Sequence, residues 1–224
     1  MNQQKIKITP DGPYLVSGTV PLEEKIIQAK GFGVEFKQGK TYPPMQNYAL
    51  CRCGQSSTMP FCDGHHKHID FDGDETASRQ PFFEQAEIFE GPYFAMADVE
   101  GLCAFARFCH AKHGDAWDLI EEGDEAYQDE CLQAINECPA GRLVALNKET
   151  REPIEPTYEP SIVILQDPSI YCSGPIWVKG GIPIESADGT QYEIRNRVTL
   201  CRCGQSENKP FCDATHVSIG FSEK

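Results

Sequence analysis

Two sets of side chains in this sequence have the types and the spacing to hold metal. Each set has three cysteines and one histidine in the pattern C-x-C-x8-C-x3-H. The first set is Cys51, Cys53, Cys62 and His66, and the second is Cys201, Cys203, Cys212 and His216. Thiolate sulfur and neutral imidazole are ligands that suit zinc and iron. The chemistry first predicted for this chain is therefore metal binding at two places.

The spacing divides each set into two pairs of ligands. Cys51 and Cys53 alternate along an extended or looped segment, so they can hold one iron atom together. Cys62 and His66 are four residues apart, which places both side chains on one face of a helical turn, where they can hold a second iron atom. Asp63 follows the third cysteine at a position where a carboxylate can cap the amides of that turn.

The number of cysteines agrees with metal or redox use. The chain has 11 cysteines among 224 residues. Disulfides are disfavoured in a reducing compartment, and an odd number of cysteines fits poorly with a fully paired disulfide framework. We therefore expect ligands or free thiols.

The metal motif belongs to an internal repeat. Residues 51–56 and 60–63 return 150 positions later, and the upstream block 12–23 returns as 174–185, at an offset of 162. The two offsets differ by 12 residues, so the first copy carries extra residues, which we expect within 31–46. Each upstream block predicts a strand, a glycine turn and a second strand.

The repeated motif resembles the CDGSH iron–sulfur family (mitoNEET-like), whose pattern is C-x-C-x2-[S/T]-x3-P-x-C-D-G-[S/A/T]-H. The resemblance implies that each set of three cysteines and one histidine binds a [2Fe–2S] cluster. The chain departs from the pattern at Ala214, where the family has glycine, and at His65, where it has a small residue. Ala214 argues against a positive φ at that position, and His65 is a rival ligand to His66.

Two questions about the motif stay open at the level of sequence. The same ligands could hold structural zinc, although paired zinc ligands are usually separated by two to four residues and C-x-C is unusual for them. Arg52 and Arg202, which lie between ligands, could donate to a cluster or could be surface charges, and we expect surface charges.

The segment between the copies has three further cysteines in a recognisable pattern. Cys103 and Cys109 are separated by five residues, and Cys138 is followed by proline. The segment resembles a divergent single-cluster ferredoxin in which Ala106 replaces the middle cysteine. The resemblance implies a third cluster, [3Fe–4S] or [4Fe–4S], held by Cys103, Cys109 and Cys138. The alternative is a degenerate unit that packs without metal.

The remaining candidate ligands have ordinary explanations. Cys131 lies seven residues before Cys138 and is either a fourth ligand or a buried thiol; we expect the thiol. Cys172 lies in a strand-like segment and is expected to be a small buried residue. His110 and His113 are close enough to compete for metal, but a lone histidine is more often structural.

The elements that must position these ligands predict a mostly β fold with a small α+β insert. We expect a CDGSH-type unit at 1–78, a ferredoxin-like unit at 79–155 and a second CDGSH-type unit at 156–224. The upstream strands of the two copies are predicted to pack as an intramolecular pseudo-dimer, which makes a monomer with an internal two-fold axis. The competing arrangement is three separate units, each copy pairing with its twin in a second chain.

Composition limits the classes of function. The net charge of −14 argues against nucleic-acid binding, and the sequence has no apolar run that predicts a membrane span. The polar N-terminus lacks the apolar core of a signal peptide, so a cytoplasmic location is expected. Nucleophile–base, phosphate-loop and dinucleotide motifs do not appear, and we expect no enzyme.

The preferred function is electron transfer or redox sensing through two [2Fe–2S] clusters, with a redox protein as partner. One alternative is a carrier that donates clusters to apo-proteins. Another is a structural zinc-binding adaptor.

Overall fold

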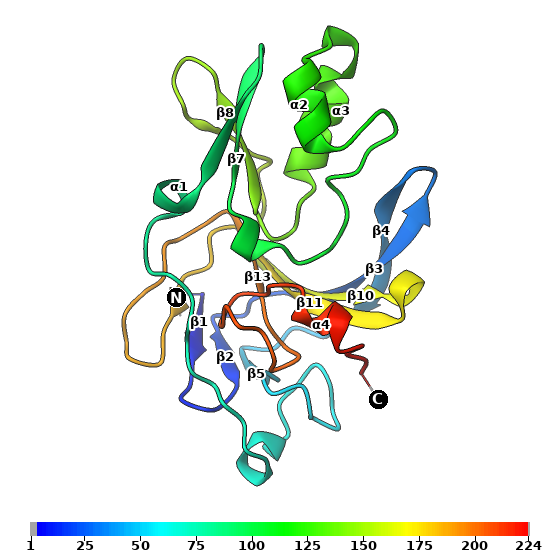
Figure 1. The fold of residues 1–224 in the computed structure, drawn as a ribbon. Helices are drawn as coiled ribbons and strands as arrows, with labels where there is room; N and C mark the ends of the chain where they lie inside the picture. Colours follow the sequence, from blue (N-terminus) through cyan, green and yellow to red (C-terminus); the bar gives the residue numbers. More distant parts are fainter. Residues whose placement is uncertain (1–3, 224) are drawn as a thin grey trace.

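The computed structural model describes residues 4–223, which form mostly strands with few helices (Figure 1). The predicted fold class is confirmed, with two β-rich units around a small α+β unit. Across the described range, the helices are all too short or too polar to cross a bilayer. The predicted boundaries of the three units stay a prediction.

Strands from the two copies form two sheets. The first sheet has the order β12-β1-β2-β5. Its strands are β1 (Lys5–Ile8), β2 (Tyr14–Ser17), β5 (Asn47–Leu50) and β12 (Ile184–Glu185). The second sheet has the order β13-β11-β10-β3-β4. Its strands are β3 (Leu22–Lys30), β4 (Gly33–Thr41), β10 (Ser161–Asp167), β11 (Cys172–Lys179) and β13 (Arg197–Leu200).

Each of these sheets includes at least one strand from the opposite copy: β12 in the first sheet, and β3 with its hairpin partner β4 in the second. β12 of the second copy lies parallel to β1, with Ile184 opposite Ile6. β3 of the first copy lies parallel to β10, with Leu22 opposite Ile162. The exchanges are equivalent, because Leu22 and Ile184 are related by the same 162-residue offset as the rest of the upstream block. The two copies therefore form the predicted pseudo-dimer.

One hydrophobic core serves both copies. Along β1 and β2 every second side chain is buried, as the period of a strand requires. The buried members from both copies include Ile6, Ile8, Tyr14, Val16, Leu22, Leu50, Ile162, Ile164, Ile176, Val178, Ile184 and Leu200. Separating the copies would expose this surface and two unpaired strand edges. The arrangement of three separate units is wrong.

The extra residues of the first copy form a β-hairpin. β3 and β4 pair antiparallel, closing with Lys30 opposite Gly33, whereas the second copy has only the short β12 at the equivalent place. β4 forms the outer strand of the second sheet. Its Phe36 stacks on Phe108 of the middle unit, with ring centroids 4.2 Å apart. The symmetry between the copies is therefore broken inside the predicted segment 31–46.

The middle unit is a four-stranded sheet with the order β6-β7-β8-β9 and helices on both faces (Figure 1). Its elements are α1 (Phe82–Gln85), β6 (Glu87–Glu90), β7 (Phe94–Asp98), η2 (Glu100–Leu102), α2 (Ala116–Glu122), η3 (Glu125–Tyr127), α3 (Gln128–Asn136), β8 (Leu143–Asn147) and β9 (Pro153–Ile154). All of β7 is buried, because Phe94 and Met96 face α2 and α3 while Ala95 and Ala97 face α1. The predicted α+β insert is confirmed.

Candidate metal sites

Each CDGSH-type ligand loop begins where the last strand at one edge of a sheet ends. β5 runs into Cys51, whose N–H donates to the Pro60 carbonyl at 2.8 Å, and the Cys62 N–H donates to the Ala49 carbonyl at 2.9 Å. The second copy makes the same bonds after β13: Cys201 N to Pro210 O at 2.8 Å, and Cys212 N to Thr199 O at 2.9 Å. Each loop therefore folds back and brings its third cysteine beside its first.

The ligands of each set lie in two close pairs. The Sγ atoms of Cys51 and Cys53 are 3.7 Å apart, and Cys62 Sγ lies 3.3 Å from His66 Nδ1. In the second copy the distances are 3.6 Å for Cys201–Cys203 and 3.3 Å for Cys212–His216. Two thiolates bound tetrahedrally at about 2.3 Å stand about 3.8 Å apart. Each pair therefore has the spacing of two ligands on one tetrahedral metal atom.

The two pairs of a set do not converge on a single point. Within residues 4–223, one group alone brings three or more metal-capable side chains within 4.8 Å of one another, and it contains neither cysteine nor histidine. A mononuclear zinc site draws all four ligands to about 3.8 Å from each other. The spacing here is that of two neighbouring metal atoms, each held by one pair.

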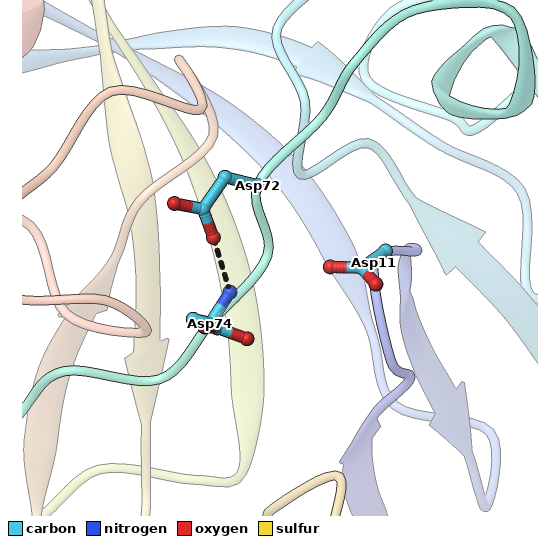
Figure 2. Close-up of side chains that lie close together, drawn as sticks. All are labelled: Asp11, Asp72 and Asp74. Carbon is cyan, nitrogen blue, oxygen red and sulfur yellow. Dashed lines mark hydrogen bonds between the residues drawn. The ribbon is translucent and has the colours of Figure 1, made fainter.

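The converging group is an exposed acidic cluster, in which Asp11, between β1 and β2, faces Asp72 and Asp74 (Figure 2). The N–H of Gly73 donates to Asp11 at 3.0 Å, and the N–H of Asp74 donates to Asp72 at 2.9 Å. The carboxylates of Asp11 and Asp72 thus accept main-chain hydrogen bonds of the segment 73–74. We assign no metal to them.

The aspartate after the third cysteine caps the histidine turn, as predicted. Asp63 accepts the N–H of His65 at 2.9 Å and the N–H of Ser57 at 2.8 Å. These hydrogen bonds lower the pKa of Asp63 and fix η1 (His65–His68) against the loop. In the second copy, Asp213 accepts from Thr215 at 3.0 Å and from Glu207 at 2.7 Å.

The expectation drawn from Ala214 was wrong. Gly64 has φ 89° and Ala214 has φ 69°, so both copies use the left-handed conformation before the histidine turn. The second copy's turn is α4 (Thr215–Ser218), and Ala214 is its N-cap residue. The chain reversal into the turn outweighs the modest preference of alanine against positive φ.

The two histidines differ in exposure. His66 is half-buried beside Cys62, while the rival His65 is exposed. His216 is buried, with 4% of its surface exposed. Burial lowers the pKa of His66, and burial followed by the nearby Arg202 charge lowers the pKa of His216 to about 4. Both rings therefore favour the neutral form, whose lone pair can bind metal.

The cysteine pairs favour one negative sulfur each. A hydrogen bond from Cys53, together with main-chain N–H groups of the loop, lowers the pKa of Cys51 to about 6. The same arrangement with Cys203 lowers the pKa of Cys201 to about 6. The pKa of the partner thiol is raised in each case. The loops thus present a stabilised thiolate where a metal would bind.

Arg52 and Arg202 are not surface charges, contrary to our expectation; each is 1% exposed. Arg202 forms an ion pair with Glu223 and donates to the Gly174 carbonyl at 2.6 Å. Arg52 donates to the Gly73 carbonyl, and its Nε and Nη1 are buried without a partner among the described residues. The sequence did not predict this burial, because the carbonyl groups that accept hydrogen bonds from the two guanidinium groups lie far from them in the sequence.

The two ligand loops touch each other, which the sequence also did not reveal. A Cβ added to Gly54 would lie 2.5 Å from the Cys203 carbonyl oxygen, and one added to Gly204 would lie 2.7 Å from that of Cys53. The buried hydroxyl of Tyr14, in the first copy, donates to the Cys201 carbonyl at 2.8 Å. The pseudo-two-fold axis therefore passes between the loops.

The three cysteines of the middle unit line one small cavity. Cys103, Cys109 and Cys138 meet there with Trp117 and Arg142. Burial, and then the neighbouring Cys138 and Cys103, raise the pKa of the Cys109 thiol to about 12. A bound cation would relieve this crowding of sulfur in an apolar setting. The structure thus brings together the three ligands that the ferredoxin resemblance implied.

A part-buried ion pair lies beside this cavity. Arg142 donates two hydrogen bonds to Asp98, at 2.6 and 2.8 Å, and Trp117 Nε1 donates to the same carboxylate at 3.1 Å. Hydrogen bonding to Asp98, and secondarily to Cys103, raises the pKa of Arg142. Arg142 thus stays protonated and is held beside the thiols by Asp98. The one sign of this role in the sequence is that Arg142 directly follows Cys138-Pro139-Ala140-Gly141.

The residues with ordinary explanations are placed as expected. Cys131 is buried on α3, where its Sγ donates to the Ala116 carbonyl at 3.6 Å, and it does not line the cysteine cavity. Cys172 is a buried residue at the start of β11. His113 pairs with Glu130 at 2.7 Å.

Comparison with known families agrees with these sites. A family described as iron-binding zinc finger of CDGSH type matches residues 11–67 and 173–217. A family described as a divergent 4Fe-4S mono-cluster matches residues 89–148. Neither the search of curated proteins nor that of solved structures found a match. Two regions that match the CDGSH-type model thus flank one region that matches the divergent 4Fe-4S mono-cluster model, and both matches support an iron–sulfur protein.

Proposed function

We propose that this chain is an electron-transfer protein that holds three iron–sulfur clusters. Cys51, Cys53, Cys62 and His66 would hold one [2Fe–2S] cluster, and Cys201, Cys203, Cys212 and His216 would hold the other. When bound, such clusters supply one-electron redox chemistry without making or breaking bonds to a substrate.

The observation that carries the proposal is the pairing of the ligands. Cys51 with Cys53, at 3.7 Å, and Cys62 with His66, at 3.3 Å, each have the separation of two ligands on one metal atom. A zinc adaptor would need all four ligands around one ion. The two-by-two arrangement favours a binuclear centre over zinc.

The middle cavity supports a third cluster of the [3Fe–4S] or [4Fe–4S] type. Cys103, Cys109 and Cys138 would supply its three thiolate ligands, and the Arg142–Asp98 ion pair lies beside them. The loop between the first two holds Phe105 at φ 53° and Arg107 at φ 65°. Such backbone strain is typical of loops that clamp a ligand.

A second candidate function, donation of a cluster to apo-proteins, has one observation in its favour. Cys62 and His66 are half-buried, so an acceptor could reach the first site. Cys212 and His216 are 3% and 4% exposed, so the second site is closed to an acceptor. Donation would therefore involve the first site alone.

Two measurements on freshly purified protein test the proposal. Iron and sulfide in stoichiometric amounts, with reversible bleaching of the visible absorption on reduction, are the expected result. Zinc in place of iron would refute it. Incubation with an apo-ferredoxin then separates the two functions: an electron-transfer protein keeps its iron, and a carrier loses iron from the first site.

A further inference from the structure

The two CDGSH-type sites are in direct main-chain contact. Gly54 and Gly204 each leave room for the carbonyl of the opposite loop, since a Cβ on either would come within 2.7 Å of it. Tyr14 of the first copy is hydrogen-bonded to Cys201 at 2.8 Å. The loops touch directly at these contacts, so the first and second sites are neighbours.

The middle site is in contact with the second CDGSH-type site. Cys138, Ala104 and Ala140 pack against Cys212 in one cluster of apolar contacts. Beside it, Asn208 of the second ligand loop donates to the Gly101 carbonyl, two residues before Cys103, at 2.8 Å.

A buried arginine fastens this contact. Arg197 lies on β13, four residues before Cys201, and is 1% exposed. Its guanidinium donates to the carbonyls of Cys138 at 2.8 Å and Leu143 at 2.9 Å. The strand that positions the second site thus also holds the middle site.

The three sites thus lie in a row in the order first, second, middle, and the exposure of their ligands agrees with a second site in the interior. Cys212 and His216 are buried, whereas Cys62 and His66 of the first site are half-buried. The middle cysteines are also half-buried, and Phe105 in their loop is 45% exposed. Partner proteins can therefore approach the two ends of the row but not its centre.

The ligands and the nearby charges predict how the reduction potential changes along the row. The middle site has no histidine among its proposed ligands, and replacing thiolate by imidazole raises the potential of a cluster. At the second site, Glu223 balances the buried Arg202. At the first site, Arg52 is buried without an ion-pair partner within residues 4–223, and the ligands are more exposed. Uncompensated positive charge and greater exposure favour reduction of the first site over the second. The lack of a histidine ligand lowers the potential of the middle site below both, so potentials should rise from the middle site through the second to the first.

We infer that the three sites form a linear intramolecular relay in which electrons pass from the middle unit through the second CDGSH-type site to the first. A one-electron carrier protein is oxidised at the middle site, and another is reduced at the first site. Each step moves one electron and neither breaks a bond nor moves a proton. The inference rests on the proposed function.

Paramagnetic resonance of the loaded, reduced full-length chain tests the order. Cys212→Ser removes a ligand of the second site, and Cys62→Ser is the matched variant at the first. In the relay, C212S abolishes the magnetic coupling seen on the signal of the middle site, and C62S leaves that coupling as in the wild type. An unchanged middle signal in C212S, or equal effects of both variants, would overturn the order.

Two further measurements keep the inference testable if C212S does not fold. Pulsed dipolar spectroscopy of the wild type must give a shorter distance from the middle site to the second than to the first; the reverse would overturn the relay. A redox titration must reduce the first site before the second and the middle site last, and any other sequence overturns its direction. Iron content separates the failures. A chain without a middle cluster refutes the proposed function and the relay together, whereas three clusters with the wrong coupling refute the relay alone.

Discussion

The contact between the two ligand loops predicts a specific cost for Gly54→Ala. The new Cβ would lie 2.5 Å from the Cys203 carbonyl oxygen, and ordinary contacts begin at 3.4 Å, so the loops must separate by about 0.9 Å. Gly54 also has φ +75°. A side chain in that region costs about 1–2 kcal/mol, and overpacking costs a further 1–3 kcal/mol or so. The total is about 2–5 kcal/mol.

Gly64→Ala is the matched control. Gly64 has φ +89° but no atom within 4 Å of an added Cβ, and Ala214 already occupies the equivalent place in the second copy. Its cost is the backbone term alone, about 1–2 kcal/mol. For a chain of this size, 1 kcal/mol corresponds to about 2–4 °C in Tm. The extra overpacking should therefore make G54A melt about 2–12 °C below G64A.

Thermal unfolding of the cluster-loaded protein, followed by far-ultraviolet circular dichroism, measures this difference. Gly204→Ala should behave like G54A, because its Cβ would lie 2.7 Å from the Cys53 carbonyl. Equal melting of G54A and G64A would mean that the loops are not in contact and would refute the arrangement of the two sites.

Four other outcomes are expected. His66→Cys and His216→Cys should retain their clusters and lower the corresponding potential, because thiolate adds negative charge; spectroelectrochemistry showing unchanged potentials would remove histidine from the ligand sets. Total iron should exceed the four atoms of two [2Fe–2S] clusters, and Cys138→Ser should reduce it without changing the [2Fe–2S] spectrum; an equal iron content in wild type and C138S would count against the third cluster. Cys131→Ala should keep full iron, because Cys131 is buried away from the cavity and burial raises its pKa to about 12; loss of iron would make it a ligand. Glu223→Gln should destabilise the chain by about 3 kcal/mol by leaving Arg202 buried and unpaired, whereas exposed Glu149→Gln should change little, and equal denaturation midpoints would disprove the role of the pair.

Features that depend on short-range spacing were predictable from the sequence. The pairing of Cys51 with Cys53 and of Cys62 with His66 follows from intervals of two and four residues. The packing of the two copies into one β-rich unit followed from the upstream repeat. A constant offset implies equivalent strands, which can exchange between the copies. The hairpin that breaks the symmetry was located by the difference between two offsets.

Features that depend on distant contacts were not predictable. Arg52 is buried because the Gly73 carbonyl, 21 residues away, accepts its guanidinium, and the sequence next to Cys51 contains no sign of this. Ala214 takes a positive φ because the turn after it outweighs its own preference. The contact between the middle unit and the second copy depends on the hydrogen bond from Arg197 to the Cys138 carbonyl, 59 positions away. Local propensity has no information about such pairs.

The exchange of β3 and β12 within one polypeptide has a consequence for how this protein can change under selection. In a homodimer of identical subunits, a single gene encodes both sites, so one substitution alters both sites together. Here each site has its own codons, and a substitution near one leaves the other as inherited. The differences already present, Glu223 beside Arg202 and a hairpin in the first copy alone, are of a kind that a homodimer of identical chains cannot have. The two sites of this chain can therefore specialise separately, although both copies depend on one shared core for their stability.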